Sequence, residues 1–324
     1  MKLNDWLNIW LNKYAKLTAK LRTYNSYKDT IEKHICPILG DYELEELSPE
    51  ILQDFVLLKL EKGNLLTGGP LANNTVIGMT NLLKQALKEA ILLKVANVNN
   101  TPFVKLPSAD EKEVTAFEKW EQEKLEKYCL NHKKPNYIGI VICLYSGIRL
   151  GELLSLTWDD IDFNKNYLFI NKTSYTAKKD DKYMIVIDTP KTKNSTRVIP
   201  LPKQLIEVLK RIKKNSKSKY VITTNKNGMV GTRSYQRTFE SIQKKLGINY
   251  KNFHSLRHTF ATRALECGMD VKTLSEILGH KNPMITLERY THSLMSYKTE
   301  MMNKLGKNLL VWFCQIRFFG WPIC

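Results

Sequence analysis

The second half of the sequence carries a set of arginine, histidine and tyrosine residues that could act together on a phosphate ester. These are Arg149 in "SGIRLGE", His254 and Arg257 in "NFHSLRHTF", His280 in "LGHKN", and Tyr290 ten residues later. A guanidinium group binds phosphate oxygens through two parallel hydrogen bonds and stays charged. A tyrosine hydroxyl, with a pKa near ~10, becomes a useful nucleophile only beside a base or a cationic site. These residue types together suit phosphoryl transfer.

Each residue also has a simpler explanation when it is considered alone. Arg149 shares a helical face with Glu152 and could form a structural ion pair with it. The HxxR spacing of His254 and Arg257 occurs in many proteins, and most tyrosines near a helix end pack a ring and make one hydrogen bond. A functional interpretation therefore depends on whether the chain brings the motifs to one place.

The predicted elements before and around Arg149 are helices. Thr115 and Glu118 have the spacing of a capping box and are expected to open an amphipathic helix. An apolar helix is expected near 138–144, followed by a break at Gly147 and a helix over about 149–156. Arg149 would project from this last helix toward the core.

A second group of elements is expected to position the later motifs. Asp270 is predicted to cap a helix that ends at Gly279 in the left-handed conformation. His280 would then lie on a sharp turn. Pro283 restarts a helix, which reaches Tyr290 two turns later. The two side chains would thus project from separate short elements.

Strand-like patterns are confined to one region. Three runs alternate polar and apolar residues between polar turns: 166–175, 182–189 and 196–201. The rest, from 202 to about 305, has helical spacing. We expect a mainly α protein, with a mostly helical second domain that contains a small antiparallel three-stranded sheet.

The N-terminal part reads as a separate helical domain over 1–96. Ser48 before Pro49 fits a helix N-cap followed by proline at the first helical position, and Asn74 fits the start of a helix that runs to about Val95. The stretch 97–114 is polar, contains two prolines and has no periodicity, so it is predicted to be a linker.

The composition favours an anionic partner and excludes several classes of protein. Lys and Arg total 50 against 32 Asp and Glu, for a formal charge of +18, which indicates nucleic acid or an acidic membrane surface. No apolar run is long enough to cross a membrane, and the N-terminus is too polar for a signal peptide, so we expect a cytoplasmic protein. Six scattered cysteines without a CxxC spacing, and one acidic run at 159–162, predict neither a zinc site nor a two-metal site.

The motifs in their order along the chain resemble the catalytic domain of the tyrosine recombinase, or phage integrase, family. The resemblance rests on "SGIRLGE", "PKTKNSTRVIPL", "HSLRH", "LGHKN" and Tyr290, and it covers about 115–305. It implies an enzyme that cuts and rejoins DNA through a 3′-phosphotyrosyl intermediate, without a metal, a nucleotide or any other cofactor.

The resemblance also implies a role for each motif residue. Arg149 and Arg257 would hold the non-bridging oxygens of the scissile phosphate, which Tyr290 would attack. His254 is our candidate for the base, and His280 would donate a hydrogen bond to a phosphate oxygen. Such cationic donors can stabilise a pentavalent transition state without a metal.

Two further residues complete the implied set. Glu152 would support the site from behind. Lys191, in the turn between the second and third strands, would protonate the leaving 5′ oxygen, with Lys193 as the alternative. His258 and His292 adjoin the motifs but match no functional position of the family.

The N-terminal helices resemble the family's core-binding domain, which closes with the catalytic domain around duplex DNA. The pattern begins almost at Met1, so no arm-binding module is expected. The predicted divisions are the core-binding domain 1–96, the linker 97–114, the catalytic domain 115–308 and an apolar tail 309–324. Basic residues on the first two helices are the candidates for DNA phosphate contacts: Lys13, Lys16, Lys20, Arg22 and Lys28.

Several alternatives stay open at this point. The tail could pack on a neighbouring protomer or have no function. Integration or excision of a bacterial or phage-encoded mobile element is favoured over resolution of chromosome dimers. Strand exchange would need a homo-tetramer on two DNA sites, and a directionality factor is left open as a further partner. The competing classes are a type IB topoisomerase and a non-catalytic DNA-binding protein.

Overall fold

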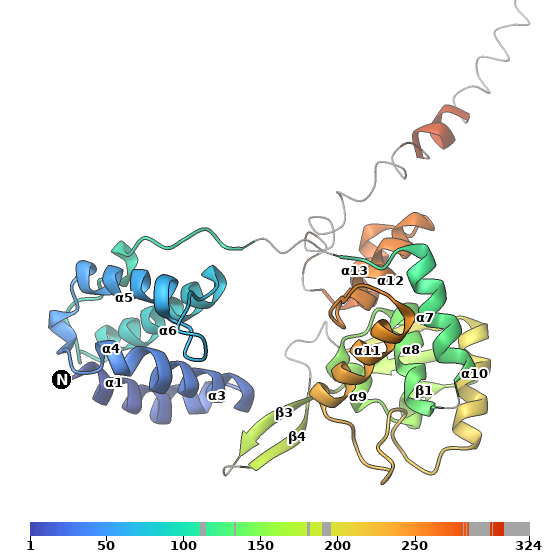
Figure 1. Cartoon of the computed structure of the whole chain (residues 1–324), viewed down its shortest axis with the longest axis horizontal. Helices are drawn as coiled ribbons and strands as arrows, with labels where there is room; N and C mark the ends of the chain where they lie inside the picture. Colours follow the sequence, from blue (N-terminus) through green and yellow to red (C-terminus); the bar gives the residue numbers. More distant parts are fainter. Residues whose placement is uncertain are drawn as a thin grey trace, which may run out of the picture. The chain divides into compact units, whose positions relative to one another are not determined.

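The computed structural model describes residues 1–110, 115–132, 134–179, 182–189, 196–280, 282, 284, 299 and 301–307 (Figure 1). The chain forms two compact units. The first comprises Met1–Glu113 with Ala177–Met184, and the second Val114–Thr176 with Ile185–Cys324.

The first unit is helical, as the sequence predicts. Its elements are α1 (Leu3–Ile9), a π-helical turn (Trp10–Ala15), α2 (Lys16–Thr18), α3 (Leu21–Thr30), a second π-helical turn (Ile31–Ile35), α4 (Cys36–Leu39), α5 (Pro49–Lys62), α6 (Asn73–Leu92), and 3-10 turns at Leu44–Glu46 and Thr101–Phe103.

Apolar faces of these helices form one core, and local capping sets where they begin. Trp6 is fully buried, and its indole Nε1 donates to the Ala86 carbonyl at 3.0 Å, which joins the first helix to α6. The Ser48 side chain accepts from the Ile51 amide, so the predicted cap of α5 is present. Helix α6 begins at Asn73, not after Asn74, because Ala72 occupies the N-cap position.

Part of the range 97–114 packs on the first unit. Val104 belongs to that unit's core, and the Asn100 side chain donates to the Leu47 carbonyl at 2.8 Å. Gln53 and the backbone of Lys105 exchange two hydrogen bonds, of 3.2 and 2.9 Å. Buried and hydrogen-bonded backbone is typical of a domain and not of a free connector.

The remaining elements belong to the second unit, apart from the strand residues within Ala177–Met184, which group with the first unit. They are α7 (Lys119–Asn131), α8 (Ile138–Ser146), α9 (Leu150–Ser155), β1 (Ile161–Asp162), β2 (Tyr167–Ile170), β3 (Thr173–Lys179), β4 (Lys182–Asp188), β5 (Arg197–Pro200), α10 (Lys203–Lys214), α11 (Thr232–Leu246), α12 (Ser255–Glu266), α13 (Val271–Leu278), and 3-10 turns at Pro135–Tyr137 and Trp158–Asp160.

Helix α8 is the centre of this unit, since it contacts α7, α9 and α12 (Figure 1). Every residue from Ile138 to Leu144 is buried, which explains why the sequence there is apolar all round. The capping box predicted for Thr115 and Glu118 is wrong. Glu118 is itself the N-cap of α7, and its partner is Glu121.

The predicted fold class, mainly α with a small antiparallel three-stranded sheet, is confirmed, but the strands differ from the predicted runs. The sheet has the order β1-β2-β5, with Leu168 opposite Ile199. The run 166–175 divides into β2 and β3, and β3 pairs with β4 in a separate two-stranded sheet. Strand β1 has only two residues, too few for a period-two pattern to reveal.

Candidate active site

The C-terminal end of α13 is the point at which the candidate site residues meet. Asp270 caps the helix by accepting from the Thr273 amide at 2.9 Å, and Gly279, with φ of +65°, ends it. Both features agree with the sequence prediction. The last carbonyls of a helix have no partner within the helix and need donors from elsewhere.

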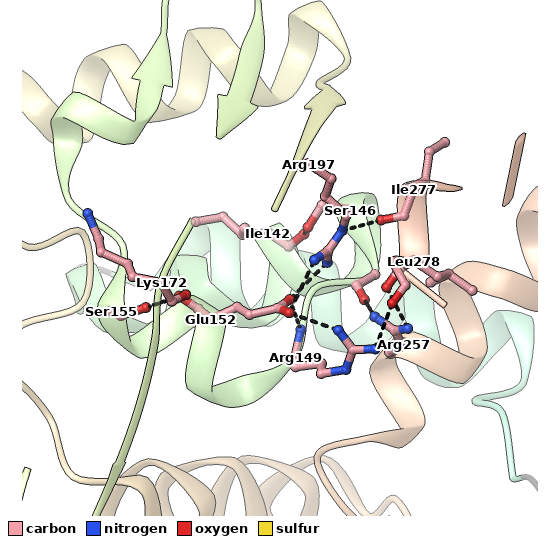
Figure 2. Close-up of polar contacts among 12 residues, drawn as sticks. Ile142, Ser146, Arg149, Glu152, Ser155, Lys172, Arg197, Arg257, Ile277 and Leu278 are labelled. Carbon is pink, nitrogen blue, oxygen red and sulfur yellow. Dashed lines mark hydrogen bonds and ion pairs between the residues drawn. The ribbon is translucent and has the colours of Figure 1, made fainter. Parts of the chain in front are cut away.

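Three arginines supply those donors, one for each of three successive carbonyls (Figure 2). Arg197 Nε donates to the Ile277 carbonyl at 2.5 Å, and Arg257 Nη2 donates to the Leu278 carbonyl at 2.7 Å. Arg149 Nη2 donates to the Gly279 carbonyl at 3.3 Å. The three guanidinium groups thus gather at the turn that leads into His280.

Arg149 and Glu152 form the ion pair that their spacing predicts. Arg149 lies at the N-cap of α9 and not inside the helix. Its backbone amide donates to Glu152 Oε2 at 2.9 Å, and its Nη1 donates to Oε1 at 2.9 Å. The side chain of Glu152 is 4% exposed and that of Arg149 is 38% exposed, so the arginine keeps a face toward solvent.

Arg197 is a member of this cluster that we did not single out from the sequence. Its Nη1 and Nη2 donate to Glu152 Oε1 and Oε2 at 3.1 and 2.8 Å (Figure 2). The signal is present in "RVIPL", because Arg197 shares a strand face with Ile199 and Leu201, both of which are buried. An arginine on the inward face of a strand requires an anionic partner.

The carboxyl of Glu152 is strongly stabilised in its charged form. Burial acts to raise its pKa, but the hydrogen bonds and charge of Arg197, together with the charge of Arg149, outweigh burial and lower the pKa to about 2. Glu152 is therefore a carboxylate at every physiological pH. The cluster contains three guanidinium groups and this one carboxylate, which pairs with Arg149 and Arg197, so it has a net positive charge and suits an anionic substrate.

Arg257 and His254 lie at the start of α12. His254 is the N-cap residue and is exposed. The centroid of its ring lies 4.6 Å from that of His258, in an edge-to-face arrangement. Arg257 is 2% exposed, and its Nη1 donates to the Gly147 carbonyl at 2.9 Å. Helix α12 therefore places Arg257 inside the cluster and His254 at its edge.

His280 follows directly on the bound carbonyls. Its backbone amide donates to the Ser275 carbonyl at 3.1 Å, and its side chain is half-buried. Tyr290, Lys191, Lys193 and the tail 309–324 lie outside the described residues. The structure thus brings together Arg149, Glu152 and Arg257 next to His280, and it leaves the expected nucleophile and general acid as sequence predictions.

The basic residues of the first unit have a different setting. Lys13, Lys16, Arg22 and Lys28 are exposed on the first helices, and Lys20 is half-buried. Lys28 lies 3.7 Å from Glu32 and is partly paired. Four of the five side chains are thus exposed, as a phosphate-binding role requires.

Neither a metal cluster nor a membrane span is present among the residues that the structure covers. No group of three His, Cys, Asp or Glu side chains there could hold a metal ion. Asp160, from the acidic run, instead accepts from Lys172 Nζ at 2.6 Å. No helix in the described ranges is long and apolar enough to cross a bilayer.

Both parts of the chain match known protein families. Residues 115–296 match the phage integrase family, and residues 2–57 match the phage integrase N-terminal SAM-like domain. A tyrosine recombinase XerC-like protein of Caldanaerobacter subterraneus subsp. tengcongensis is 29% identical over 94% of this chain and 82% of its own length. The transposase of transposon Tn916 from Enterococcus faecalis is 26% identical, over 91% of this chain and 76% of its own.

A solved structure has the same fold. The Tn1549 transposon integrase, in complex with a circular intermediate DNA, superposes with a TM-score of 0.78 at 22% identity, over 94% of this chain and 99% of that chain. The family model covers the arginine cluster, His280 and Tyr290 in one continuous match. The chain belongs to the phage integrase family, the tyrosine recombinases, which are enzymes of site-specific DNA recombination.

Proposed function

We propose that this recombinase integrates or excises a mobile genetic element by cutting and rejoining duplex DNA at the ends of that element. Its similarity to a transposase of transposon Tn916 supports this purpose, as does its excess of basic residues. The bacterial sources of the relatives support action in a bacterial cytoplasm.

The chemistry proceeds by an exchange of phosphate ester bonds. The Tyr290 hydroxyl oxygen attacks the scissile phosphorus, the bond from phosphorus to the 5′ oxygen breaks, and the phosphate stays on the 3′ end as a phosphotyrosyl ester. His254 accepts the tyrosine proton, and Lys191 donates a proton to the leaving 5′ oxygen. The reverse attack by a 5′ hydroxyl restores the DNA, so no nucleotide is consumed.

The observation that carries this proposal is the positive cluster at the end of α13. Arg149 and Arg257 come from separate elements and donate to the adjacent carbonyls of Gly279 and Leu278, directly before His280. A phosphate at this turn would meet guanidinium and imidazole donors together. Donors that are already in place stabilise developing charge without reorganisation.

The depth of the two arginines gives them different parts in phosphate binding. The side chain of Arg149 is 38% exposed and can meet a phosphate from solvent. Arg257 is 2% exposed, so it contacts phosphate only after the groups that cover it move. This fits a site that reaches its reactive geometry when DNA binds.

The first unit supplies affinity for the duplex. Lys13, Lys16, Lys20, Arg22 and Lys28 bind backbone phosphates, and the binding therefore weakens as salt increases. Recombination between two duplex sites cuts four strands, and each chain has one nucleophile in Tyr290. A homo-tetramer on two sites follows from this stoichiometry. A directionality factor is compatible with this assembly.

The decisive experiment is a covalent trap. The purified chain is incubated, without metal, with a nicked duplex from the end of the element that carries its gene, so that a short 5′ fragment diffuses away after cleavage. We expect a covalent protein–DNA adduct from the unaltered chain and none from Tyr290→Phe.

Three results would count against the proposal. An adduct that persists in Tyr290→Phe removes the nucleophile assignment. Equal adduct formation on unrelated DNA favours relaxation by a type IB topoisomerase. A chain that binds the duplex and never forms an adduct is a DNA-binding protein without this chemistry.

A further inference from the structure

Arg197 directs all three of its guanidinium nitrogens to protein acceptors and is less exposed than Arg149. Its side chain is 6% exposed, whereas that of Arg149 is 38% exposed. Its Nε donates to the Ile277 carbonyl, and its two Nη atoms donate to the two oxygens of Glu152. Because each nitrogen of this guanidinium group already has a protein acceptor, we expect any effect of Arg197 on the reaction to act through those partners.

The first partner is Glu152. Arg149 and Arg197 each donate a hydrogen bond to each of its two carboxylate oxygens. Oε1 accepts from Nη1 of Arg149 at 2.9 Å and from Nη1 of Arg197 at 3.1 Å. Oε2 accepts from the Arg149 amide at 2.9 Å and from Nη2 of Arg197 at 2.8 Å. Figure 2 shows the carboxylate between the two guanidinium groups.

The sharing determines the charge that Arg149 offers to a substrate. With Arg197 present, the carboxylate is neutralised from the protein side, and the charge of Arg149 remains available toward solvent. Without Arg197, Arg149 would be the nearest cation to a buried carboxylate. Its positive charge would then be largely neutralised by Glu152. The potential at the phosphate position would fall although Arg149 itself is unchanged.

The second partner is the end of α13. Strand β5 contacts α13, and the bond from Arg197 Nε to the Ile277 carbonyl fixes the first of the three carbonyls that precede His280. Arg197 thereby ties Glu152, and through it Arg149, to the turn that carries His280. A shift of about 1 Å in such a group can slow a reaction about a hundredfold.

We propose that Arg197 is a positioning residue for DNA cleavage: it neutralises Glu152 and anchors the end of α13, so that Arg149 presents its charge to the scissile phosphate. This inference rests on the proposed function, in which Arg149 binds that phosphate. Arg197 touches neither the substrate nor the reacting atoms.

The test compares Arg197→Met with a matched control, Arg263→Met. Arg263 is also partly buried, at 22% exposure, and bonds a glutamate, Glu266, at 2.8 Å and a carbonyl, that of Phe117, at 2.8 Å. In these bonds it contacts neither Glu152 nor the end of α13. Thermal unfolding and DNA affinity are measured for both variants. If Arg197→Met does not fold, the test uses Arg197→Lys, which keeps the positive charge but lacks the guanidinium group that binds both oxygens of Glu152.

The readout is the single-turnover rate of adduct formation at saturating protein on two nicked duplexes. One has an ordinary scissile phosphate, and the other has a methylphosphonate there, which lacks the negative charge and needs less positive potential. We expect Arg197→Met to slow the ordinary substrate about tenfold to a hundredfold, with little change in DNA affinity. On the methylphosphonate we expect a loss of less than about threefold, and Arg263→Met should match the unaltered chain on both.

A second comparison tests the route through Glu152. In a Glu152→Gln background, Arg197→Met should slow cleavage less than about threefold further, because the carboxylate that Arg197 neutralises is already gone. A loss that is equal on both substrates, or equal to that of Arg263→Met, would show that Arg197 only stabilises the fold. Absence of any adduct from the unaltered chain overturns the proposed function and this inference with it, whereas the variant results bear on Arg197 alone.

Discussion

In the second unit, Arg149, Arg197 and Arg257 are fixed by a carboxylate and by backbone carbonyls, whereas Lys13, Lys16 and Arg22 of the first unit extend from helix surfaces into solvent. Fixed charge can be aimed at a single phosphate and can raise a rate. Solvated charge follows any phosphate backbone and raises affinity in a salt-dependent way. Under the proposed function the excess of basic residues serves both purposes, and mutations should separate them.

The largest expected effect is on stability, from removal of the carboxylate that the arginines share. Glu152→Ala should lower the free energy of unfolding by about 3–5 kcal/mol, because buried guanidinium groups lose their partner. Glu266→Ala is the matched control; its pair with Arg263 is 31% exposed on the glutamate side. Glu266→Ala should lower the free energy of unfolding by about 1 kcal/mol or less. Urea unfolding of both variants at neutral pH measures the difference.

The same carboxylate predicts a pH dependence of stability. The pKa of Glu152 is lowered from 4.5 to about 2 in the folded chain, so the folded state binds this proton less readily than the unfolded state does. Its stabilising contribution is complete above pH ~4.5 and is lost as the pH falls toward 2. Glu152→Gln should remove this part of the acid dependence, and an unchanged acid profile would contradict the assignment.

The next effect concerns the backbone that carries the site. Gly147 and Gly247 both end helices with left-handed φ, of +63° and +66°. A Cβ at Gly147 would lie 2.5 Å from Cδ1 of Phe260 and 2.8 Å from Cδ2 of Leu278, whereas a Cβ at Gly247 would meet nothing within 4 Å. Gly247→Ala should cost about 1–2 kcal/mol for the backbone alone, and Gly147→Ala about 1–3 kcal/mol more. Equal losses in thermal unfolding would show that packing around Gly147 relaxes freely.

A fourth prediction addresses the solvated charge. The triple variant K13A/K16A/R22A should bind duplex DNA about tenfold to a hundredfold more weakly, and the slope of log affinity against log salt should become shallower by about 2 to 3. Its cleavage rate at saturating protein should stay within about twofold of the unaltered chain. The control K62A/K84A/K88A removes the same number of exposed positive charges from α5 and α6 and should leave the slope unchanged.

The smallest effect compares two helix caps, one in each unit. Ser48→Ala and Asp270→Ala each remove one side-chain acceptor and should each lower the free energy of unfolding by about 1 kcal/mol. Only Asp270→Ala should also slow cleavage, by about threefold, because α13 leads into His280. Asp270→Asn keeps an acceptor and should restore the rate, and an equal slowing by Ser48→Ala would break the distinction between the units.

Local chemistry was readable from the sequence wherever one residue determines one conformation. Ser48, Asp270 and Gly279 act as predicted because a cap needs only its neighbours. The capping box at Thr115 was misplaced because Glu118, three residues later, could also serve as the cap. Spacing alone cannot rank two capping residues that compete for one helix start.

The sequence predicts only part of the arginine cluster, for a different reason. The pair of Arg149 and Glu152 is three residues apart, so helical spacing predicts it. Arg197 reaches the same carboxylate from a strand 45 residues away, and the partner of its Nε lies 80 residues away. Only the packing of β5 on α13 brings these atoms together, and no pattern within either element encodes that contact.

The three carbonyls at the end of α13 also set an order of events while the chain is being made. Arg149 lies 130 residues before its acceptor at Gly279, and Arg197 lies 80 residues before Ile277. Contacts across such separations form late, since the intervening chain must first be closed into a loop. Until residues 277–279 have left the ribosome, the three arginines have no end of α13 to hold. Under the proposed function, a growing chain that already displays the basic helices of its first unit would therefore still lack the site that cuts DNA.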